Sequence, residues 1–212
     1  MIGIVDYNAG NITSVERALE RLGVPHIISK NPRDLQGCSK LIFPGVGDAS
    51  YAMDQLRSSG LASFLKESST SGKLILGICL GSQVIFDHSD EGDTDCLALL
   101  SGCVKSFKSL FLERGVDPIA FKVPHMGWND LDVTGECHLL DGVDSRASFY
   151  FVHSYVICPQ DESIVKAWAD YGVGVPAIVQ KGNVAACQFH PEKSGQEGLK
   201  ILANFCRDGF SF

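Results

Sequence analysis

A cysteine held between two glycines is the segment of this 212-residue chain with the clearest capacity for chemistry. The apolar run Leu74–Leu76 leads directly into residues 77–81, GICLG. A sharp strand-to-helix turn strains the backbone of its central residue, so the residues two before and two after it must be small. The pattern predicts a thiol nucleophile at Cys79, with the N–H of Leu80 pointing where an oxyanion would form. The alternative is a buried core thiol between two turn glycines.

A base and an orienting carboxylate are available near the other end of the chain. His190 follows the apolar run Val184–Phe189 and precedes Pro191 and Glu192. Proline keeps the residue before it extended, and side chains two apart on extended backbone point the same way. Glu192 can then hold one imidazole nitrogen while the other faces a thiol. On their own, this His and Glu fit a strand end at the surface; together with Cys79 they predict a Cys-His-Glu triad.

A second oxyanion donor is expected from another loop at a strand end. Residues 44–47, PGVG, follow the expected strand Lys40–Phe43. Two glycines allow a peptide plane in this loop to adopt or to switch between unusual conformations. No GK[ST] follows, so the segment is not a phosphate loop. A plain Gly/Pro turn is the alternative interpretation.

The elements that must position these residues alternate in the first half of the chain. Apolar β-branched runs predict strands, and apolar residues at helical spacing predict helices between them. The expected strands are Ile2–Val5, His26–Ser29, Lys40–Phe43 and Leu74–Cys79, and the expected helices are Thr13–Leu22, Tyr51–Leu56 and Leu61–Lys66. This alternation is typical of a parallel sheet covered on both faces.

The second half reads as successive strands at hairpin spacing, which favours antiparallel pairing. The expected strands are Val104–Phe107, Ile119–Val123, Ser148–Ile157, Ile164–Ala169, Pro176–Val179 and Val184–Phe189, followed by a helix from Gly195 to Cys206. We therefore predict a single α/β domain over residues 1–212, with one mixed, mostly parallel, open sheet and helices on both faces. In such sheets, sites lie outside the carboxyl ends of the strands, where all three candidate segments fall.

Composition narrows the classes of function. With 45% hydrophobic and 20% charged residues the chain is an ordinary globular protein, and a net charge of −7 without a basic stripe argues against nucleic-acid binding. The eight cysteines form no CxxC pair, so we predict no metal site and free thiols in a reducing compartment. We expect no secretory signal, no membrane span and a cytoplasmic location, because apolar runs are far shorter than about 20 residues.

The motifs resemble a known family. GICLG at 77–81 with HPE at 190–192 resembles the class I, triad-type glutamine amidotransferases, which implies a flavodoxin-like core. VDYNAGNI at 5–12, FPGVG at 43–47, PHMGWN at 124–129, FVHSY at 151–155 and FHPEKSG at 189–195 are similar to the glutaminase subunits of imidazole glycerol phosphate synthase. The likeness covers essentially the whole chain.

The resemblance implies a role for each matching residue and no cofactor. Cys79 would attack the side-chain amide of L-glutamine, His190 would move the proton to the leaving ammonia, and Glu192 would orient His190. Backbone N–H groups of Val46 and Leu80 would bind the oxyanion, and a thioester would be hydrolysed to glutamate. Positions that would line the glutamine pocket are Gly47, Gln83, His153, Ser154 and Tyr155.

The same resemblance implies a partner, the cyclase subunit HisF, which would receive the ammonia for histidine biosynthesis in a heterodimer. Positions that would face it are Asn8, Asn11, Trp128, Asn129 and Lys193. Free glutaminase would waste ammonia, so we expect low activity alone and strong stimulation by a ligand-loaded partner, through reorientation of the Gly45–Val46 peptide. The alternative for Trp128 is a buried core indole.

One residue departs from the family pattern, and three rival functions stay open. Ser82 stands where Met is expected, which would change the packing of the helix after Cys79 without abolishing activity. The first rival is a glutaminase subunit serving anthranilate, pyridoxal phosphate or purine synthesis. The second is a cysteine hydrolase outside the amidotransferases, and the third is a binding module with a relic site; the intact Cys, His and Glu set argues against the third.

Overall fold

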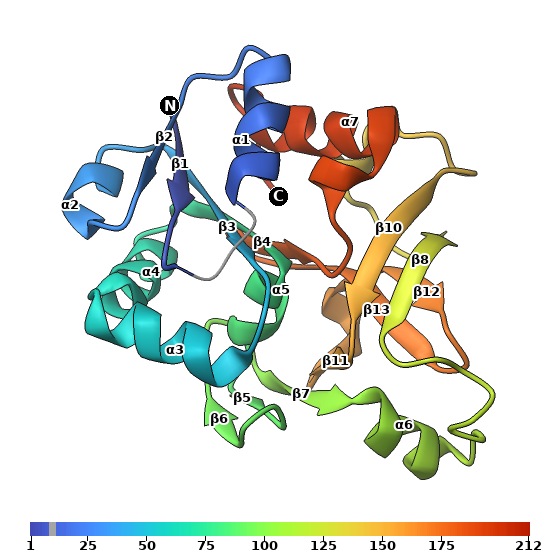
Figure 1. Ribbon diagram of the computed structural model, residues 1–212. Helices are drawn as coiled ribbons and strands as arrows, with labels where there is room; N and C mark the ends of the chain where they lie inside the picture. Colours follow the sequence, from blue (N-terminus) through green and yellow to red (C-terminus); the bar gives the residue numbers. More distant parts are fainter. Residues whose placement is uncertain (9–11) are drawn as a thin grey trace.

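The computed structural model describes residues 1–8 and 12–212. Its centre is an eight-stranded sheet in the order β2-β1-β3-β4-β14-β13-β12-β9 (Figure 1). Its strands are β1 Ile2–Val5, β2 His26–Ser29, β3 Lys40–Gly45, β4 Leu74–Cys79, β9 Asp132–Val133, β12 Val165–Asp170, β13 Gly174–Lys181 and β14 Val184–Cys187. The five from β2 to β14 are parallel, and the last three pair antiparallel. The predicted α/β class with a mixed, mostly parallel sheet is confirmed.

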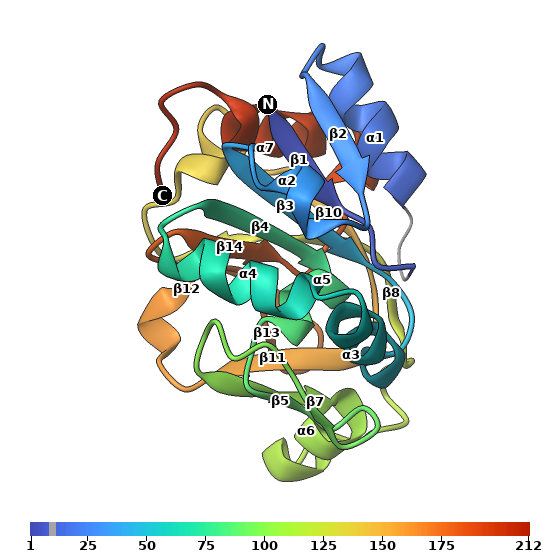
Figure 2. The ribbon, with the colours of Figure 1, turned by 90° about the vertical axis from the view of Figure 1, so that its left-hand side faces the viewer.

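Helices cover both faces of this sheet, as predicted (Figure 2). On one face lie α1 (Ile12–Arg21), the 3-10 turn η3 (Pro191–Lys193) and α7 (Gly195–Cys206); on the other lie α2 (Pro32–Leu35), α3 (Ala49–Ser58), α4 (Leu61–Thr70) and α5 (Leu80–Val84). Side chains alternate between the two cores because strand residues point to opposite faces: Ile42 packs in the first, Leu41 and Phe43 in the second. None of the described helices is long and apolar enough to cross a membrane.

Two smaller sheets stand beside the main one, where the sequence predicted a single sheet. One pairs β8 (His125–Asp130) with β10 (Ser148–His153), and the other has the order β11-β7-β5-β6. The strands of the second are β5 His88–Ser89, β6 Thr94–Asp95, β7 Gly102–Ser106 and β11 Tyr155–Pro159. Helix α6 (Phe107–Arg114) and the short turns η1 (His138–Leu140) and η2 (Glu162–Ile164) complete the described elements.

Two strand predictions were wrong in this half. Residues 119–123 form turns instead of a strand, and Ile119 is 92% exposed. Phe121 of this segment packs by its side chain on Phe111 and Tyr171, so the apolar pattern reflects aromatic packing without a strand partner. The run predicted as one strand over Ser148–Ile157 is broken at Ser154, and its two halves pair in different sheets.

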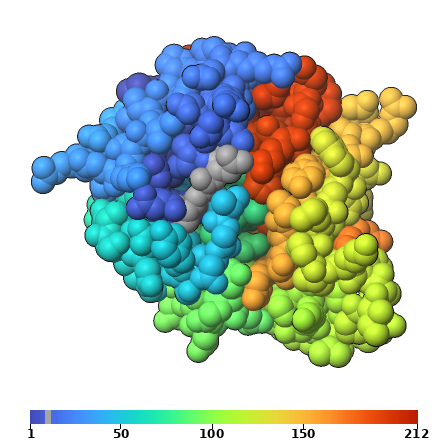
Figure 3. Space-filling view, in the orientation of Figure 1, coloured from blue at the N-terminus to red at the C-terminus, as the bar shows by residue number. Residues whose placement is uncertain are grey.

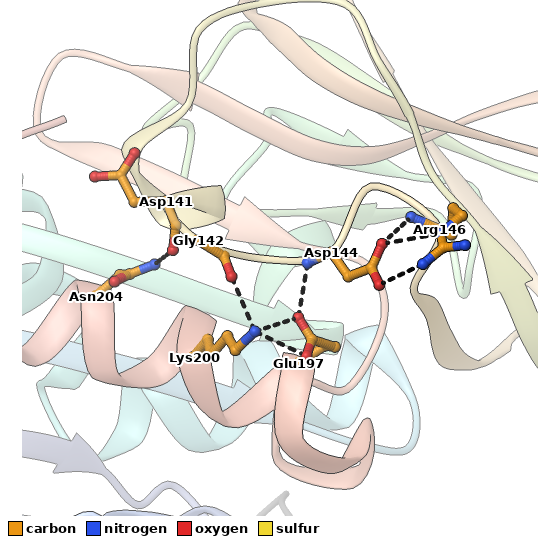
Figure 4. A network of polar contacts seen from close by, with 7 residues as sticks. All are labelled: Asp141, Gly142, Asp144, Arg146, Glu197, Lys200 and Asn204. Carbon is orange, nitrogen blue, oxygen red and sulfur yellow. Dashed lines mark hydrogen bonds and ion pairs between the residues drawn. The ribbon is translucent and has the colours of Figure 1, made fainter.

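Helix α7, which follows the His-Pro-Glu segment, is tied to the loop after η1 by a polar network (Figure 4). Lys200 Nζ donates to the Gly142 carbonyl and to the Glu197 carboxylate, both at 2.9 Å. Glu197 accepts from the Asp144 N–H at 2.8 Å, and Asn204 Nδ2 donates to the Asp141 carbonyl at 2.8 Å. These bonds hold α7 against this loop along most of its length.

Candidate active site

Cys79 is the last residue of β4 and the N-cap of α5, with φ 53° and ψ −109°. A side chain at its flanking glycines has no space: a Cβ at residue 81 would lie 1.9 Å from the Phe43 carbonyl oxygen, and one at Gly77 would lie 2.8 Å from the Gly81 oxygen. The strained turn predicted from the glycine spacing is therefore present. Ser82 donates its hydroxyl proton to the Cys79 carbonyl at 2.5 Å, which holds the first turn of α5.

His190 lies just past the end of β14, next to the end of β4 in the sheet order. Its N–H donates to the Tyr150 carbonyl at 2.9 Å, so β10 fixes its backbone. Its Nδ1 donates to Glu192 Oε1 at 2.7 Å, and both side chains are 2% exposed. Ser194 secures this turn, because its hydroxyl donates to the His190 carbonyl at 2.6 Å and accepts from the Tyr150 N–H at 3.0 Å.

The electrostatics of this imidazole come from two neighbours. Burial lowers the pKa of His190, but hydrogen bonding and charge interaction with Cys79 and Glu192 outweigh burial and raise the pKa to about 9. Among the described residues, His190 Nε2 has no partner that satisfies hydrogen-bond geometry, and the Cys79 thiol is directed to the Val152 carbonyl at 3.8 Å. A rotation of the thiol toward Nε2 would align sulfur, imidazole and carboxylate in sequence.

An open cavity of about 270 Å³ lies over Cys79. Its lining includes the residues that the sequence placed in a glutamine pocket and an oxyanion site: Val46, Gly47, Leu80, Gln83, His153, Ser154 and Tyr155. In the space-filling view the surface is hollowed between the cyan segment that leads into α3 and the orange β10–β11 segment (Figure 3). His190 and Glu192 lie behind this cavity, against Gly45, Val46 and Ile78.

Gln83 is held in the cavity by two bonds from its amide nitrogen. Nε2 donates to the Tyr155 carbonyl and to Gln188 Oε1, both at 3.1 Å. The remaining polar atom, Oε1, accepts no hydrogen bond from the described residues. This arrangement fixes the amide orientation, because a carbonyl oxygen only accepts.

Glu91 is a cavity residue that sequence reasoning missed. It lines the cavity on the loop after β5, and its Oε2 accepts from the Ala49 N–H at 2.9 Å. Burial raises the pKa of this carboxyl, and the Ala49 hydrogen bond opposes the shift. No local motif marks the residue; only the path of the chain from α5 through β5 brings it to the cavity.

The described residues that were predicted to face a partner lie outside the cavity. Trp128 is 60% exposed on β8, so the alternative of a buried indole is excluded. Its ring stands 6.1 Å from that of Tyr150, which in turn is 6.4 Å from the imidazole of His190. Asn129 is partly buried, and its amide donates to the Asp170 carbonyl at 2.8 Å.

Asn8 and Lys193, two further positions predicted to face the partner, lie on different parts of the surface. Asn8 is exposed and donates its side-chain amide to Gln55 Oε1 at 3.1 Å. Lys193 lines a hollow with Arg17 and Arg21 of α1. Asn11 falls outside the residues that the structure describes.

Comparison with known proteins identifies the family. The family described as Glutamine amidotransferase class-I matches residues 3–208 of the chain. Imidazole glycerol phosphate synthase subunits HisH of Geobacillus sp. strain WCH70 and Nitratidesulfovibrio vulgaris strain Hildenborough are 48% and 44% identical to it. These alignments cover 97% and 98% of this chain and 95% and 96% of the relatives. The chain belongs to the HisH family of class I glutamine amidotransferases.

Solved structures share the fold of this HisH family member at low sequence identity. A crystal structure of a glutamine amidotransferase superposes with a TM-score of 0.71 at 22% identity, covering 96% of each chain. A chain of PurLQS from Thermotoga maritima gives 0.70 at 20% identity, again over 96% of each. The resemblance deduced from the motifs is confirmed at the level of family and fold.

Proposed function

We propose that the chain is the glutaminase subunit of an imidazole glycerol phosphate synthase and hydrolyses L-glutamine to glutamate and ammonia with Cys79, His190 and Glu192. One observation supports the chemistry most directly: a thiol on a strained turn lies at a cavity, and a buried imidazole whose Nδ1 is bound to a carboxylate follows the neighbouring strand. Sequence identities of 44% and 48% to HisH relatives, over nearly the whole chain, support the choice of acceptor pathway.

In the first half of the reaction, the Cys79 sulfur attacks the amide carbon of glutamine after its proton has moved to His190. The pKa of His190, raised to about 9 by its neighbours, favours the imidazolium that results. Leu80 begins α5, so its N–H has no acceptor within the helix and is available to the oxyanion. We propose the Val46 N–H as the second donor.

The second half restores the enzyme. The imidazolium of His190 gives its proton to the departing nitrogen, the carbon–nitrogen bond breaks, and ammonia leaves a thioester on Cys79. Water then attacks the thioester, gives a proton to His190 and releases glutamate as the carbon–sulfur bond breaks. The sum is glutamine and water to glutamate and ammonia, so side chains, backbone N–H groups and water suffice and no cofactor is required.

The polar groups of the cavity suit the amino-acid end of glutamine. The Glu91 carboxylate and Gln83 Oε1 are acceptors for an α-ammonium group, and the cavity volume of about 270 Å³ accommodates one amino acid. We propose Gly47, His153, Ser154 and Tyr155 as the rest of the pocket. The chain would act in the cytoplasm as a heterodimer with the cyclase subunit HisF, which would take up the ammonia.

Glutamate release from glutamine by the complex with a HisF cyclase tests the chemistry. We expect Cys79→Ser to lower kcat by at least about 10³-fold, because the hydroxyl is a far weaker nucleophile than a thiolate. Cys103→Ser, a partly buried thiol of β7 outside the cavity, serves as the control and should retain activity within about twofold. A Cys79→Ser complex with full activity would refute the triad.

The acceptor is tested separately. Expression of the chain with its cyclase should restore growth of a histidine auxotroph that lacks the glutaminase subunit. Restoration of an anthranilate, pyridoxal phosphate or purine auxotroph instead would reassign the acceptor and leave the glutaminase chemistry in place.

A further inference from the structure

A hydrogen-bonded chain of three side chains leads from the cavity wall into the β8–β10 pair. His153 Nδ1 lies 2.7 Å from the Tyr155 carbonyl oxygen, and His125 Nδ1 lies 3.0 Å from His153 Nε2. Asn129 Nδ2 lies 3.4 Å from His125 Nε2. The two imidazoles are 3% and 5% exposed, so water does not compete for these contacts.

The direction of every bond in this chain follows from one carbonyl. Because a carbonyl oxygen only accepts, His153 must carry a proton on Nδ1. Burial lowers the pKa of His153 to about 3 and that of His125 to about 4, so both rings are neutral near pH 7. His153 Nε2 is then an acceptor, and His125 must donate to it from Nδ1. His125 Nε2 is left to accept from the amide of Asn129.

The side-chain amide of Asn129, at the far end of this hydrogen-bonded series, has a single orientation as well. The amide nitrogen of Asn129 donates to the Asp170 carbonyl at 2.8 Å, and its Oδ1 accepts from the Asp130 N–H at 2.9 Å. A flipped amide would place like atoms together at both contacts. Asn129 therefore presents a donor, and not an acceptor, to His125.

Aromatic packing holds the imidazole of His125, the middle member of the hydrogen-bonded series. The His125 imidazole is stacked between Phe151, at 4.8 Å and 18°, and Tyr171, at 4.0 Å and 20°. Tyr171 is itself fixed, because its hydroxyl donates to the Lys122 carbonyl at 2.8 Å. A ring turned over within this stack would put carbon atoms where Nδ1 and Nε2 now bond.

His153, at the other end of the hydrogen-bonded series, helps to shape the cavity. The bond from His153 to the Tyr155 carbonyl spans Ser154, the single residue between the end of β10 and the start of β11. The same carbonyl accepts from Gln83, and the Ser154 carbonyl accepts from the Phe107 N–H at 3.1 Å. All of His153, Ser154, Tyr155 and Gln83 line the cavity, so this corner sets the position of one wall.

We propose that His125 is a positioning residue for glutamine: by donating from Nδ1 to His153, it fixes the tautomer and orientation of that imidazole and thereby holds the Ser154 corner of the pocket. The inference rests on the proposed glutaminase function. His125 touches no substrate, because it is buried beneath the cavity wall and acts through His153.

Two substitutions separate hydrogen bonding from packing. His125→Phe keeps a ring in the stack but removes both bonds, whereas His125→Asn loses the ring and keeps a side-chain N–H at the place of Nδ1. In the complex with the cyclase, we expect His125→Phe to raise the KM for glutamine about fivefold to tenfold, with kcat within about twofold. His125→Asn should keep KM closer to that of the unchanged chain, in spite of a lower Tm.

A role in packing alone predicts the reverse order of KM, with the Phe variant near the unchanged chain and the Asn variant impaired, and that order would overturn the proposal. His138→Phe is the control. His138 lies in η1 and takes no part in the hydrogen bonds between His153, His125 and Asn129, so the substitution should leave KM unaltered. If His125→Phe fails to fold, ¹⁵N spectra of the unchanged protein decide, because they report the tautomer of each histidine. His153 protonated on Nε2 would refute the proposal.

Failure of the inference and failure of the proposed function give different results. If the unchanged complex releases no glutamate from glutamine, the glutaminase assignment falls. If it is active and both His125 variants share its KM, only the positioning role falls.

Discussion

At the scale of single residues, the charge state of His190 governs how the site responds to pH. The pKa of this imidazole is raised from 6.5 to about 9 by Cys79 and Glu192, against the effect of burial. A group whose pKa rises on folding stabilises the folded state fully below its unfolded pKa, here about 6.5, and that contribution is lost as pH rises through about 9. The imidazolium is also the form that can protonate departing ammonia.

The first prediction concerns the alkaline side of the pH profile. In the complex, kcat/KM for glutamine should fall above about pH 9, where His190 loses its proton. Glu192→Gln removes the neighbouring negative charge, so the fall should move about 1–2 units lower. Initial rates of glutamate release between pH 6 and pH 10 measure the shift. An alkaline limb that stays in place in the variant would show that Glu192 does not set the pKa of His190.

The second prediction concerns the tight turn beneath Cys79. A Cβ at residue 81 would meet the Phe43 carbonyl oxygen at 1.9 Å, and a backbone atom cannot yield as a side chain does. Gly81→Ala should therefore lower the free energy of unfolding by more than about 3 kcal/mol, measured by urea titration.

Gly37 provides the matched control for that substitution. No heavy atom lies within 4 Å of a Cβ placed there, and its φ is outside the left-handed region. Gly37→Ala should change stability by less than about 1 kcal/mol. Equal stability of the two variants would contradict the steric argument for the turn.

At the scale of elements, the His190 turn depends on a hydrogen bond from β10 to Ser194, a contact that the motif FHPEKSG does not itself reveal. Ser194 is 3% exposed and joins β10 to the turn by accepting from Tyr150 and donating to the His190 carbonyl. The third prediction is that Ser194→Ala costs about 1–3 kcal/mol of stability, because the buried Tyr150 N–H loses its acceptor. It should also lower kcat, since the backbone of His190 is released.

Thermal unfolding and glutamate release measure the two effects of Ser194→Ala. Ser58→Ala on α3 is the control, because within the described part of the chain that exposed hydroxyl bonds only to the Gln55 carbonyl of its own helix. A Ser194 variant with a lower Tm and unchanged kcat would limit the bond to a structural role.

Elements with a simple hydrophobic period could be predicted from the sequence. The bounds of β1, β2, β4 and α7 coincide with the expected ranges, since a buried parallel strand is a continuous apolar run and α7 has a clear apolar stripe. Helix α6 and the break at Ser154 could not be predicted. Phe107 ends the range expected as a strand yet begins a helix. The corner at Ser154 is set by a bond from Phe107, which is distant in the sequence, and by the bond from the His153 side chain to the Tyr155 carbonyl.

In the site, too, residues within local sequence patterns could be predicted, whereas residues placed by distant parts of the chain could not. Cys79, His190 and Glu192 were singled out because each belongs to a local pattern with a physical meaning. Glu91 belongs to no such pattern, and His125 lies in PHMGWN, a motif that gives this histidine no physical role by itself. Their places beside the cavity arise from the path of the chain through β5 and from the pairing of β8 with β10.

At the scale of the whole molecule, the proposed partner surface and the cavity share a strand pair. Trp128 and Met126 are exposed on β8, next to Asn129, whose amide begins the bonded chain toward the pocket. On β10, His153 belongs to the pocket and Tyr150 fixes the backbone of His190. A cyclase that docks on β8 would therefore contact the elements that hold the site.

The last prediction tests that arrangement. We expect little glutamate release by the chain alone and strong stimulation by a cyclase loaded with its ligand, since the Gly45–Val46 peptide can then reorient toward the oxyanion. Trp128→Ala should weaken binding of the cyclase by about tenfold or more, as truncating an aromatic anchor usually does. Titration of the cyclase into the chain, followed by calorimetry and by glutamate release, measures both quantities. Leu112→Ala, equally apolar and exposed but on α6, should leave both unchanged. High turnover without the cyclase would contradict this prediction, because the site would then be complete without binding of the cyclase at β8.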